Sequence, residues 1–210
     1  MNSLVCSACG APISILNPAT VSIACPYCDC VMIRTDKGIE ERGSQSRLPE
    51  GYSRLYRGAT GTIGDQRFQV LGRVRYSFGT GFWDEWYVML DNGEGHWITE
   101  DDYSFSFQVL YRGSAEVFPY DQYSVGDNIE LGERGYQVKE VGNAECLGIE
   151  GEVPKGILPC EKYPYVDAVS YDGTHVLGLE YDNDQDPPTV FVGRWLKPSD
   201  IRLENEELEW

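Results

Sequence analysis

The sequence predicts an all-β protein, and three observations support this fold class. Apolar and polar side chains alternate along 72–78 and again along 83–90, which is the period of two expected of β-strands. Asn92-Gly93 follows the second stretch, and this dipeptide favours tight turns because both residues tolerate a positive φ. The 23 glycines and the 12% of aromatic residues suit strands and turns. We therefore expect two strands joined by a Gly-rich turn, and a third strand that includes Trp97.

The alternation also predicts which side chains share a face. Trp86, Val88 and Leu90 are expected to face a core, because large apolar side chains bury the most area. Glu85 has the opposite parity and is then expected on the polar face, in contact with solvent.

Two CxxC pairs near the N-terminus are the strongest chemical signal in the sequence. Fifteen residues separate Cys6 and Cys9 from Cys25 and Cys28. Four thiolates around one tetrahedral ion form a closed shell, which suits a structural Zn²⁺ because zinc needs neither redox change nor an open position. We predict one structural zinc site in a zinc ribbon over residues 1–34. A rubredoxin-like iron centre would use the same four sulfurs and stays an alternative.

The residues around these cysteines refine the prediction. Alternating apolar residues on both sides of Asn17-Pro18 predict a hairpin between the two cysteine pairs. Cys30 is a fifth thiol, which we expect to be a half-buried strand residue and not a ligand. The chain has seven cysteines, and this odd number fits a reducing compartment and a metal site better than a disulfide framework.

A sequence pattern divides the rest of the chain into two units. The pattern G-x4-[IL]-G-x3-[FY]-Q-V occurs at 58–70 and again at 126–138. We expect two related antiparallel β units over 58–112 and 123–203, the second with an insertion, arranged in a barrel- or sandwich-like way.

Two polar segments lie outside these units. Residues 35–57 are rich in charges, Gly and Ser, which is typical of a linker, so we expect the ribbon to be tethered to the body of the protein. Residues 204–210 are expected to form an acidic tail with frayed structure.

The formal net charge of −17 is distributed unevenly. Residues 1–60 hold six basic against five acidic side chains, so residues 61–210 carry a net charge of −18. A surface this acidic repels phosphate groups, and we expect no nucleic-acid binding by this body. The charge can serve solubility alone, or it can attract a basic partner.

The sequence gives no sign of a membrane segment. No stretch approaches the roughly 20 apolar residues of a membrane span. The first residues lack the basic and apolar regions of a signal peptide, so we expect a cytoplasmic protein that does not insert into membranes.

Catalytic signals are sparse, and the chain is expected to be non-catalytic. Three carboxylates are weak candidates for acid–base chemistry, namely Glu85, Glu152 and Asp167. Glu85 lies between two tryptophans, where an apolar surrounding would raise its pKa as in a general acid. Two carboxylates that face each other across a cleft would suit hydrolysis of a glycoside-like bond.

Basic and aromatic residues supply the candidates for binding. Positive charge is rare after residue 60, and three arginines stand out, namely Arg73, Arg75 and Arg194. We expect them to pair with Asp84, Glu85 and Glu152, or to bind the carboxylates of a ligand. Three aromatic residues of one predicted strand are candidates for a binding groove, namely Trp83, Trp86 and Tyr87.

The chain resembles a bacterial family catalogued as "domain of unknown function 4178". The resemblance covers residues 55–200 and rests on the motifs GRVRY (72–76), WDEWYVML (83–90), GYQVKEVG (135–142), GEVP (151–154) and FVGRW (191–195). It implies that a zinc ribbon often precedes the domain. It also implies an association with envelope-stress proteins of the phage-shock/ESCRT-III-like and Band-7 kinds, or with polyamine-synthesis genes.

The function expected first is a zinc-ribbon adaptor that binds other proteins through exposed β edges or an aromatic groove. The alternative is a small-ligand sensor or hydrolase that uses Glu85, Glu152 and Asp167. Its ligand would be a cation such as a polyamine, which the acidic body attracts.

Overall fold

The fold consists almost entirely of antiparallel strands. The computed structural model describes residues 2–35, 38–45, 48, 53–182 and 187–204, with the backbone alone for 2–3 and 38–45. The acidic tail beyond residue 204 and parts of the expected linker lie outside the described residues. Two short 3-10 helices are Tyr120–Gln122 and Pro198–Asp200. The strands are β1 (Asn2–Val5), β2 (Pro12–Ile15), β3 (Ser22–Ala24), β4 (Cys30–Thr35), β5 (Gly38–Gln45), β6 (Thr60–Ile63), β7 (Gln66–Ser77), β8 (Phe82–Leu90), β9 (Gly95–Asp101), β10 (Ser104–Leu110), β11 (Asn128–Leu131), β12 (Arg134–Val153), β13 (Lys162–Ser170), β14 (His175–Glu180), β15 (Thr189–Leu196) and β16 (Ile201–Leu203).

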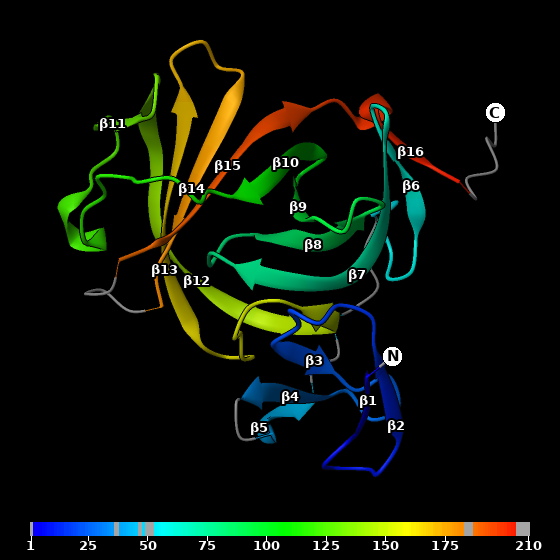
Figure 1. Ribbon diagram of the computed structural model, residues 1–210. Coiled ribbons are helices and arrows are strands. Elements are labelled where there is room, and N and C mark those ends of the chain that lie inside the picture. Colours follow the sequence, from blue (N-terminus) through cyan, green and yellow to red (C-terminus); the bar gives the residue numbers. More distant parts are fainter. Residues whose placement is uncertain (1, 36–37, 46–47, 49–52, 183–186, 205–210) are drawn as a thin grey trace.

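Eight of the described strands close into a ring (Figure 1). Each strand pairs with the next in the order β7, β8, β9, β10, β15, β14, β13 and β12, and β12 returns to pair with β7. All of these pairings are antiparallel. The predicted all-β class is confirmed in its barrel-like form. The two expected units contribute four strands each to this single ring.

The two stretches that share the Gly and Gln-Val pattern have matching backbone contacts. The amide of Gly58 donates to the carbonyl of Val70, and the amide of Gly126 donates to that of Val138, both at 2.9 Å. In each stretch a four-residue strand, β6 or β11, pairs with the start of the long strand that follows it.

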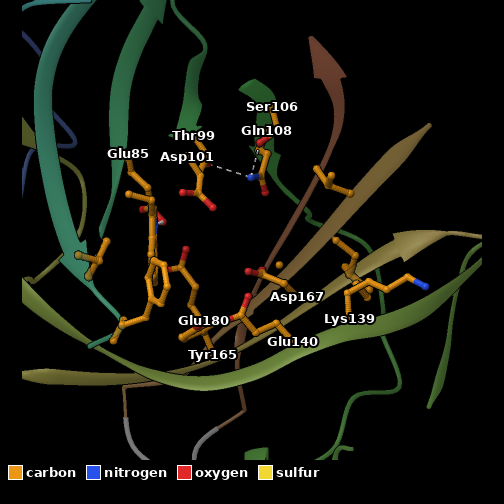
Figure 2. A pocket seen from close by; sticks show the side chains of 18 of the residues that line it. Glu85, Thr99, Asp101, Ser106, Gln108, Lys139, Glu140, Tyr165, Asp167 and Glu180 are labelled. Carbon is orange, nitrogen blue, oxygen red and sulfur yellow. Dashed lines mark hydrogen bonds between the residues drawn. The ribbon is translucent and has the colours of Figure 1, made fainter. Parts of the chain in front are cut away.

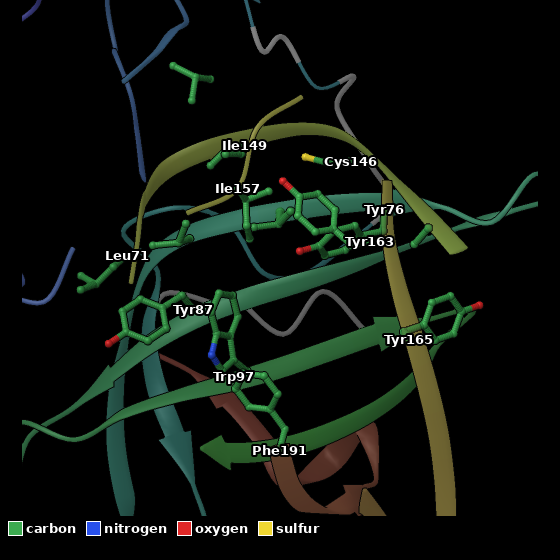
Figure 3. Close-up of a cluster of buried hydrophobic side chains, with 14 residues drawn as sticks. Leu71, Tyr76, Tyr87, Trp97, Cys146, Ile149, Ile157, Tyr163, Tyr165 and Phe191 are labelled. Atoms are coloured by element: carbon green, nitrogen blue, oxygen red, sulfur yellow. The ribbon is translucent and has the colours of Figure 1, made fainter. Parts of the chain in front are cut away.

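One half of the ring interior is filled by apolar side chains (Figure 3). Strands from opposite sides of the ring contribute to this cluster, so it occupies the interior. Within it, Tyr87 and Trp97 pack together with their ring centroids 5.0 Å apart. The members drawn from six ring strands include Leu71, Val74, Tyr76, Tyr87, Trp97, Ala144, Cys146, Ile149, Tyr163, Tyr165 and Phe191. An interior formed by eight strands is just wide enough for side chains to fill or to hold one small ligand.

Further apolar clusters cover the outside of the ring, and this corrects one expectation. Trp86 and Val88 belong to an outer cluster with Leu55 and Ile63, while Glu85 points into the ring. The period of two in β8 was predicted correctly, but Glu85 does not face bulk solvent. The reason is that the strand is covered on both faces, by the ring interior on one side and by a second layer on the other.

The N-terminal ribbon is joined to the ring by strand pairing. After leaving the ring, β12 pairs with β3 of the ribbon through Glu152↔Ile23 and Val153↔Ser22. The expected tether over 35–57 contains β5, which pairs with β4 and extends the same sheet. In the described residues the ribbon therefore shares a continuous sheet with the ring.

Buried hydrogen bonds reinforce this junction. The Glu152 carboxylate accepts from the amides of Leu16 and Asn17 at 2.9 and 3.2 Å, and from Thr20 Oγ1 at 2.6 Å. Asn17 Nδ2 in turn donates to the Tyr87 hydroxyl at 2.8 Å. Glu152 is 6% exposed, so this carboxylate is a structural acceptor at the junction.

The strands of the ribbon pair differently from the expected hairpin around Asn17-Pro18. β2 pairs with β1, and β3 pairs with β4 and β12. The segment between β2 and β3 instead turns its backbone amides toward Glu152. A buried carboxylate that accepts several hydrogen bonds outweighs the local preference for a hairpin.

Substitution of Glu152 by Gln tests the junction. We expect Glu152→Gln to lower the free energy of unfolding by about 1.5–3 kcal/mol, because hydrogen bonds to a charged acceptor are lost in a buried site. Urea-induced unfolding would measure this. Glu133→Gln, at an exposed turn, is the matched control and should change stability by less than about 0.5 kcal/mol. Equal stability of the two variants would contradict the assignment.

Candidate functional site

The four predicted cysteine ligands lie together at one end of the ribbon. Cys6 Sγ is 3.7 Å from Cys28 Sγ, and Cys9 Sγ is 3.8 Å from Cys25 Sγ. All four sulfurs lie within 4.8 Å of one another. A tetrahedron with metal–sulfur bonds of about 2.3 Å has edges of about 3.8 Å. The cluster therefore has the dimensions of a four-thiolate metal site.

Two equivalent turns place these sulfurs. In the first, the amide of Gly10 donates to the carbonyl of Cys6 at 2.9 Å, and in the second the amide of Asp29 donates to that of Cys25 at 3.0 Å. Gly10 has φ +76° and Asp29 has φ +58°. Gly adopts this conformation without steric cost, and Asp is among the side chains that tolerate it best.

Cys30 lies outside the cluster, as the sequence predicted, but it is fully buried where a half-buried strand residue was expected. Its backbone carbonyl accepts from the amide of Cys25 at 2.9 Å, which completes the second turn. Its Sγ points to the carbonyl of Val31 at 3.8 Å. The side chain is 4% exposed and belongs to the small apolar core of the ribbon.

The second candidate site is a cavity of about 320 Å³ in the other half of the ring interior. All eight ring strands contribute to its lining. Cavities of roughly 300–1,000 Å³ are typical of small-ligand sites. Figure 2 shows acidic side chains from five strands pointing into this space, namely Glu85, Asp101, Glu140, Asp167 and Glu180.

The strand register explains why these carboxylates meet. Glu140 and Asp167 are directly opposite each other in the pairing of β12 with β13. A bulge between Val138 and Glu140 shifts the register just before this pair. Like charges directly opposite each other are destabilising, so this arrangement disfavours ionisation of both carboxylates at once.

Burial and nearby negative charges raise the pKa of Asp167 and of Glu85. Desolvation, followed by the charges of Glu140, Glu85 and Asp101, raises the pKa of Asp167 to about 7. Desolvation also raises the pKa of Glu85, against the opposing effects of Lys155 and of the hydrogen bond from Trp83. Water reaches the Asp167 carboxyl within the cavity, although protein surrounds it.

Aromatic rings form one wall of the cavity. Trp83 stacks on Tyr76 with centroids 5.3 Å apart and meets Tyr165 edge-on at the same distance. Trp83 Nε1 donates to Glu85 Oε1 at 3.0 Å, and the Tyr165 hydroxyl donates to Glu140 Oε1 at 2.5 Å. The aromatic wall therefore orients two of the carboxylates.

Comparison with known proteins identifies the family of the ring. The family described as "Domain of unknown function (DUF4178)" matches residues 57–198, which include every strand of the ring. The chain belongs to this family. No curated protein and no solved structure matches the chain. The interior cavity thus lies within the DUF4178 domain, and the four cysteines lie outside it.

The helices in the described part of the chain are short 3-10 helices. None has the length and apolar character that crossing a membrane requires.

The DUF4178 ring brings some of the predicted residues together and separates others. Glu85, Asp167 and Trp83 all line the cavity. Glu152 lies at the ribbon junction, where Tyr87 is also anchored through Asn17. The expected grouping of Trp83 with Trp86 and Tyr87 is not found, because Trp86 is buried on the outer face of the ring and Tyr87 in its apolar half.

Arg73 and Arg75 serve the packing of the outer face. Arg75 donates from Nε and Nη2 to the two oxygens of Asp84 at 2.8 and 2.7 Å. Arg73 Nε lies 3.3 Å from Asp84 Oδ1, and its guanidinium covers the Trp86 ring at 5.0 Å. The expected partner Asp84 is confirmed, whereas Glu85 and Glu152 lie elsewhere.

Arg194 is exposed on β15 and lines a separate, open groove on the outside of the ring. The same groove includes His96, Arg134 and His175. Arg134 Nη1 lies 2.6 Å from His175 Nδ1. The predicted arginines are therefore divided between a buried ion-pair network and this groove, and none lines the interior cavity.

Sequence reasoning missed several residues of the cavity. Asp101, Glu140, Lys155 and Glu180 were not candidates, although each lines it. The available signal was in β9, where Asp101 continues the parity of the buried Trp97. Parity alone does not show which set of alternating residues faces inward. The closed ring determines this, so Asp101 could be assigned to the interior only from the structure.

The metal site can be tested by elemental analysis. We expect one metal ion per chain, and we expect Cys9→Ser to lose it because three thiolates no longer close the shell. Cys30→Ser, a buried cysteine outside the cluster, is the control and should keep the ion. Loss of metal from both variants, or from neither, would contradict the assigned ligands.

The pKa of Asp167 predicts how stability depends on pH. The folded protein keeps a proton on Asp167 up to about pH 7, while the unfolded chain releases it near its ordinary pKa of 3.8. Stability is therefore lost as the pH rises from about 4 to 7. We expect Asp167→Asn to raise the melting temperature at pH 8 and to raise it less at pH 5. Asp65→Asn, on an exposed turn, is the control, and its effect on the melting temperature should be the same at pH 5 and pH 8. If Asp167→Asn also has the same effect at both pH values, the raised pKa of Asp167 is wrong.

Proposed function

We propose that the DUF4178 ring binds a small organic cation, such as a protonated amine, in its interior cavity. The observation that carries this proposal is the convergence of five carboxylates from five strands on one space of about 320 Å³. Carboxylates crowded into one cavity repel one another, and a bound ammonium group would pair with those that Lys155 does not already neutralise.

The remaining lining supports the same chemistry. Gln108 Nε2 donates to Thr99 Oγ1 and Ser106 Oγ at 3.0 and 2.9 Å, so its oxygen is the group left for a ligand. The cavity is therefore rich in hydrogen-bond acceptors, which suits the N–H donors of an amine. Trp83 and Tyr165 line the same cavity and supply aromatic rings of the kind that interact favourably with cations.

The charge of the whole body favours the approach of such a ligand. Residues 61–210, which contain the ring strands, carry a net charge of −18. A strongly negative surface raises the local concentration of cations and their rate of association.

Binding is favoured over hydrolysis by the positions of the candidate residues. The hydrolase alternative used Glu85, Glu152 and Asp167, but Glu152 is held by three donors at the ribbon junction. A binding site needs only charge and shape, which the cavity supplies. The adaptor role and the link to envelope-stress proteins stay predictions. The aromatic residues Trp86 and Tyr87 that were expected to form its groove are buried.

For the ribbon, we propose a structural zinc ion. Four thiolates with no open position provide no site for a substrate, which supports a structural role. Zinc fits this closed tetrahedral shell without redox change. An absorption spectrum of the purified protein would distinguish it from iron, which is coloured in such a site.

The binding proposal can be tested with a charged probe and its neutral analogue. We expect benzylammonium to raise the melting temperature at pH 8 by mass action, and benzyl alcohol to have no effect. Glu85→Gln and Asp167→Asn should each weaken binding by about tenfold in calorimetry, because each removes a charged acceptor. Asp65→Asn is the matched control and should bind as the wild type does.

A steric variant provides an independent test. A Cβ added at Gly178 would lie 3.6 Å from Asp167 Oδ1 and from Gln108 Oε1, so a larger side chain there projects into the cavity. We therefore expect Gly178→Val to abolish binding of benzylammonium without removing any charge. Equal binding of the charged and neutral probes, or full binding by Gly178→Val, would refute the proposal.

A further inference from the structure

Lys155 is one of two basic side chains that line the acidic cavity in the described residues. It belongs to the segment that follows β12, and its Nζ forms an ion pair with Glu180 Oε2. The ammonium also lies 5.9 Å from the centre of the Tyr163 ring. Its side chain is 16% exposed, so the charge is held within the protein.

Lys139 is the other basic residue among the described lining residues, and it differs in position. Its Nζ donates to Gln137 Oε1 at 2.6 Å in an exposed contact. In Figure 2 the Lys139 side chain extends away from the carboxylates. Lys155 is therefore the positive charge that a ligand inside the cavity would meet.

We propose that Lys155 determines the charge of the ligand: its ammonium occupies the end of the cavity formed by Glu85 and Glu180 and excludes a second positive group from it. This inference rests on the proposed binding of an organic cation. It makes the cavity selective for a ligand with a single ammonium group over one of the same length with two.

The electrostatics around Lys155 support its role as a resident counter-ion. Burial lowers the pKa of Lys155, while the charges of Glu85 and Asp182 act in the opposite direction. Lys155 in turn opposes the rise in the pKa of Glu85 that burial causes. Removal of the ammonium would leave Glu180 and Glu85 without their cation and open that position to a second ammonium of the ligand.

The ribbon holds the backbone of Lys155 in place. Ser22 Oγ donates to the carbonyl of Lys155 at 2.6 Å and receives the amide of Ile157 at 3.0 Å. Ser22 is fully buried on β3. Ser22 is therefore a positioning residue for the Lys155 side chain, and Ser22→Ala loosens that position while keeping the charge.

Calorimetry with two probes of equal length tests the inference. The probes are n-pentylammonium and 1,4-butanediammonium, whose chains have the same number of non-hydrogen atoms, at pH 8.5 so that Asp167 is ionised. We expect Lys155→Gln to raise the ratio of the association constants, dication over monocation, by about tenfold, because a second charged hydrogen-bonding site becomes free. Lys139→Gln is the matched control and should leave the ratio unchanged. Ser22→Ala should raise the ratio by less than Lys155→Gln.

The double variant Lys155→Gln with Glu180→Gln completes the test. It replaces the ion pair by two amides, so the ratio should return toward the wild-type value. It also avoids the uncompensated carboxylate that could destabilise the single variant. If the wild type binds the probes and Lys155→Gln leaves their ratio unchanged, the inference is wrong and the proposed function stands. If the wild type binds neither amine, both are wrong.

Discussion

Closure of the ring between β7 and β12 is the contact on which the other features of the structure depend. The pairing runs from Glu145↔Ser77 to Gly151↔Gly72. At its end the two backbones are so close that a Cβ on Gly72 would lie 2.5 Å from the carbonyl oxygen of Glu152. Gly151, with φ +70°, would place a Cβ 2.2 Å from the carbonyl oxygen of Leu71. Two glycines therefore permit the closure. Without it the strands would form an open sheet, and neither the apolar cluster nor the cavity would have an interior to occupy.

The interior of the closed ring has an apolar half, which stabilises the fold, and an acidic half, which forms the cavity. Its apolar half packs large rings such as Trp97 and Phe191, whose centroids are 6.5 Å apart. Its other half gathers carboxylates that repel one another, which is unfavourable for a core. The outer clusters compensate for this, because they bury the second face of both halves of the ring. A cluster of carboxylates inside a β-ring is unfavourable for folding. Departures of this kind from normal core composition are expected at functional sites.

The sequence predicted the features that local chemistry determines. The spacing of Cys6, Cys9, Cys25 and Cys28 is sufficient for a four-sulfur site, since each pair needs only its own turn. The period of two located β7 and β8 correctly. It could not show which face of β8 meets water, because alternation distinguishes two faces without saying what covers them. Closure joins β7 to β12, about 75 residues apart in sequence, so the inward position of Glu85 followed from a contact that no local pattern contains. Glu152 shows the same limit, because nothing in its neighbourhood indicates that ribbon amides surround its carboxylate.

Strand β12 connects the cavity, the closure of the ring and the ribbon. β12 carries Glu140 into the cavity, closes the ring, and then pairs with β3 of the ribbon through Glu152. The ribbon core is small, and β3 has only three residues, so strand pairing alone would hold it weakly. Small domains of this size commonly depend on a metal for their stability. A metal bound by the four cysteines would therefore stabilise more than the ribbon, because Ser22 and Asn17 reach the ring from the same short segment. These two contacts attach the ribbon to the apolar half of the ring through Tyr87 and to the cavity through the backbone of Lys155.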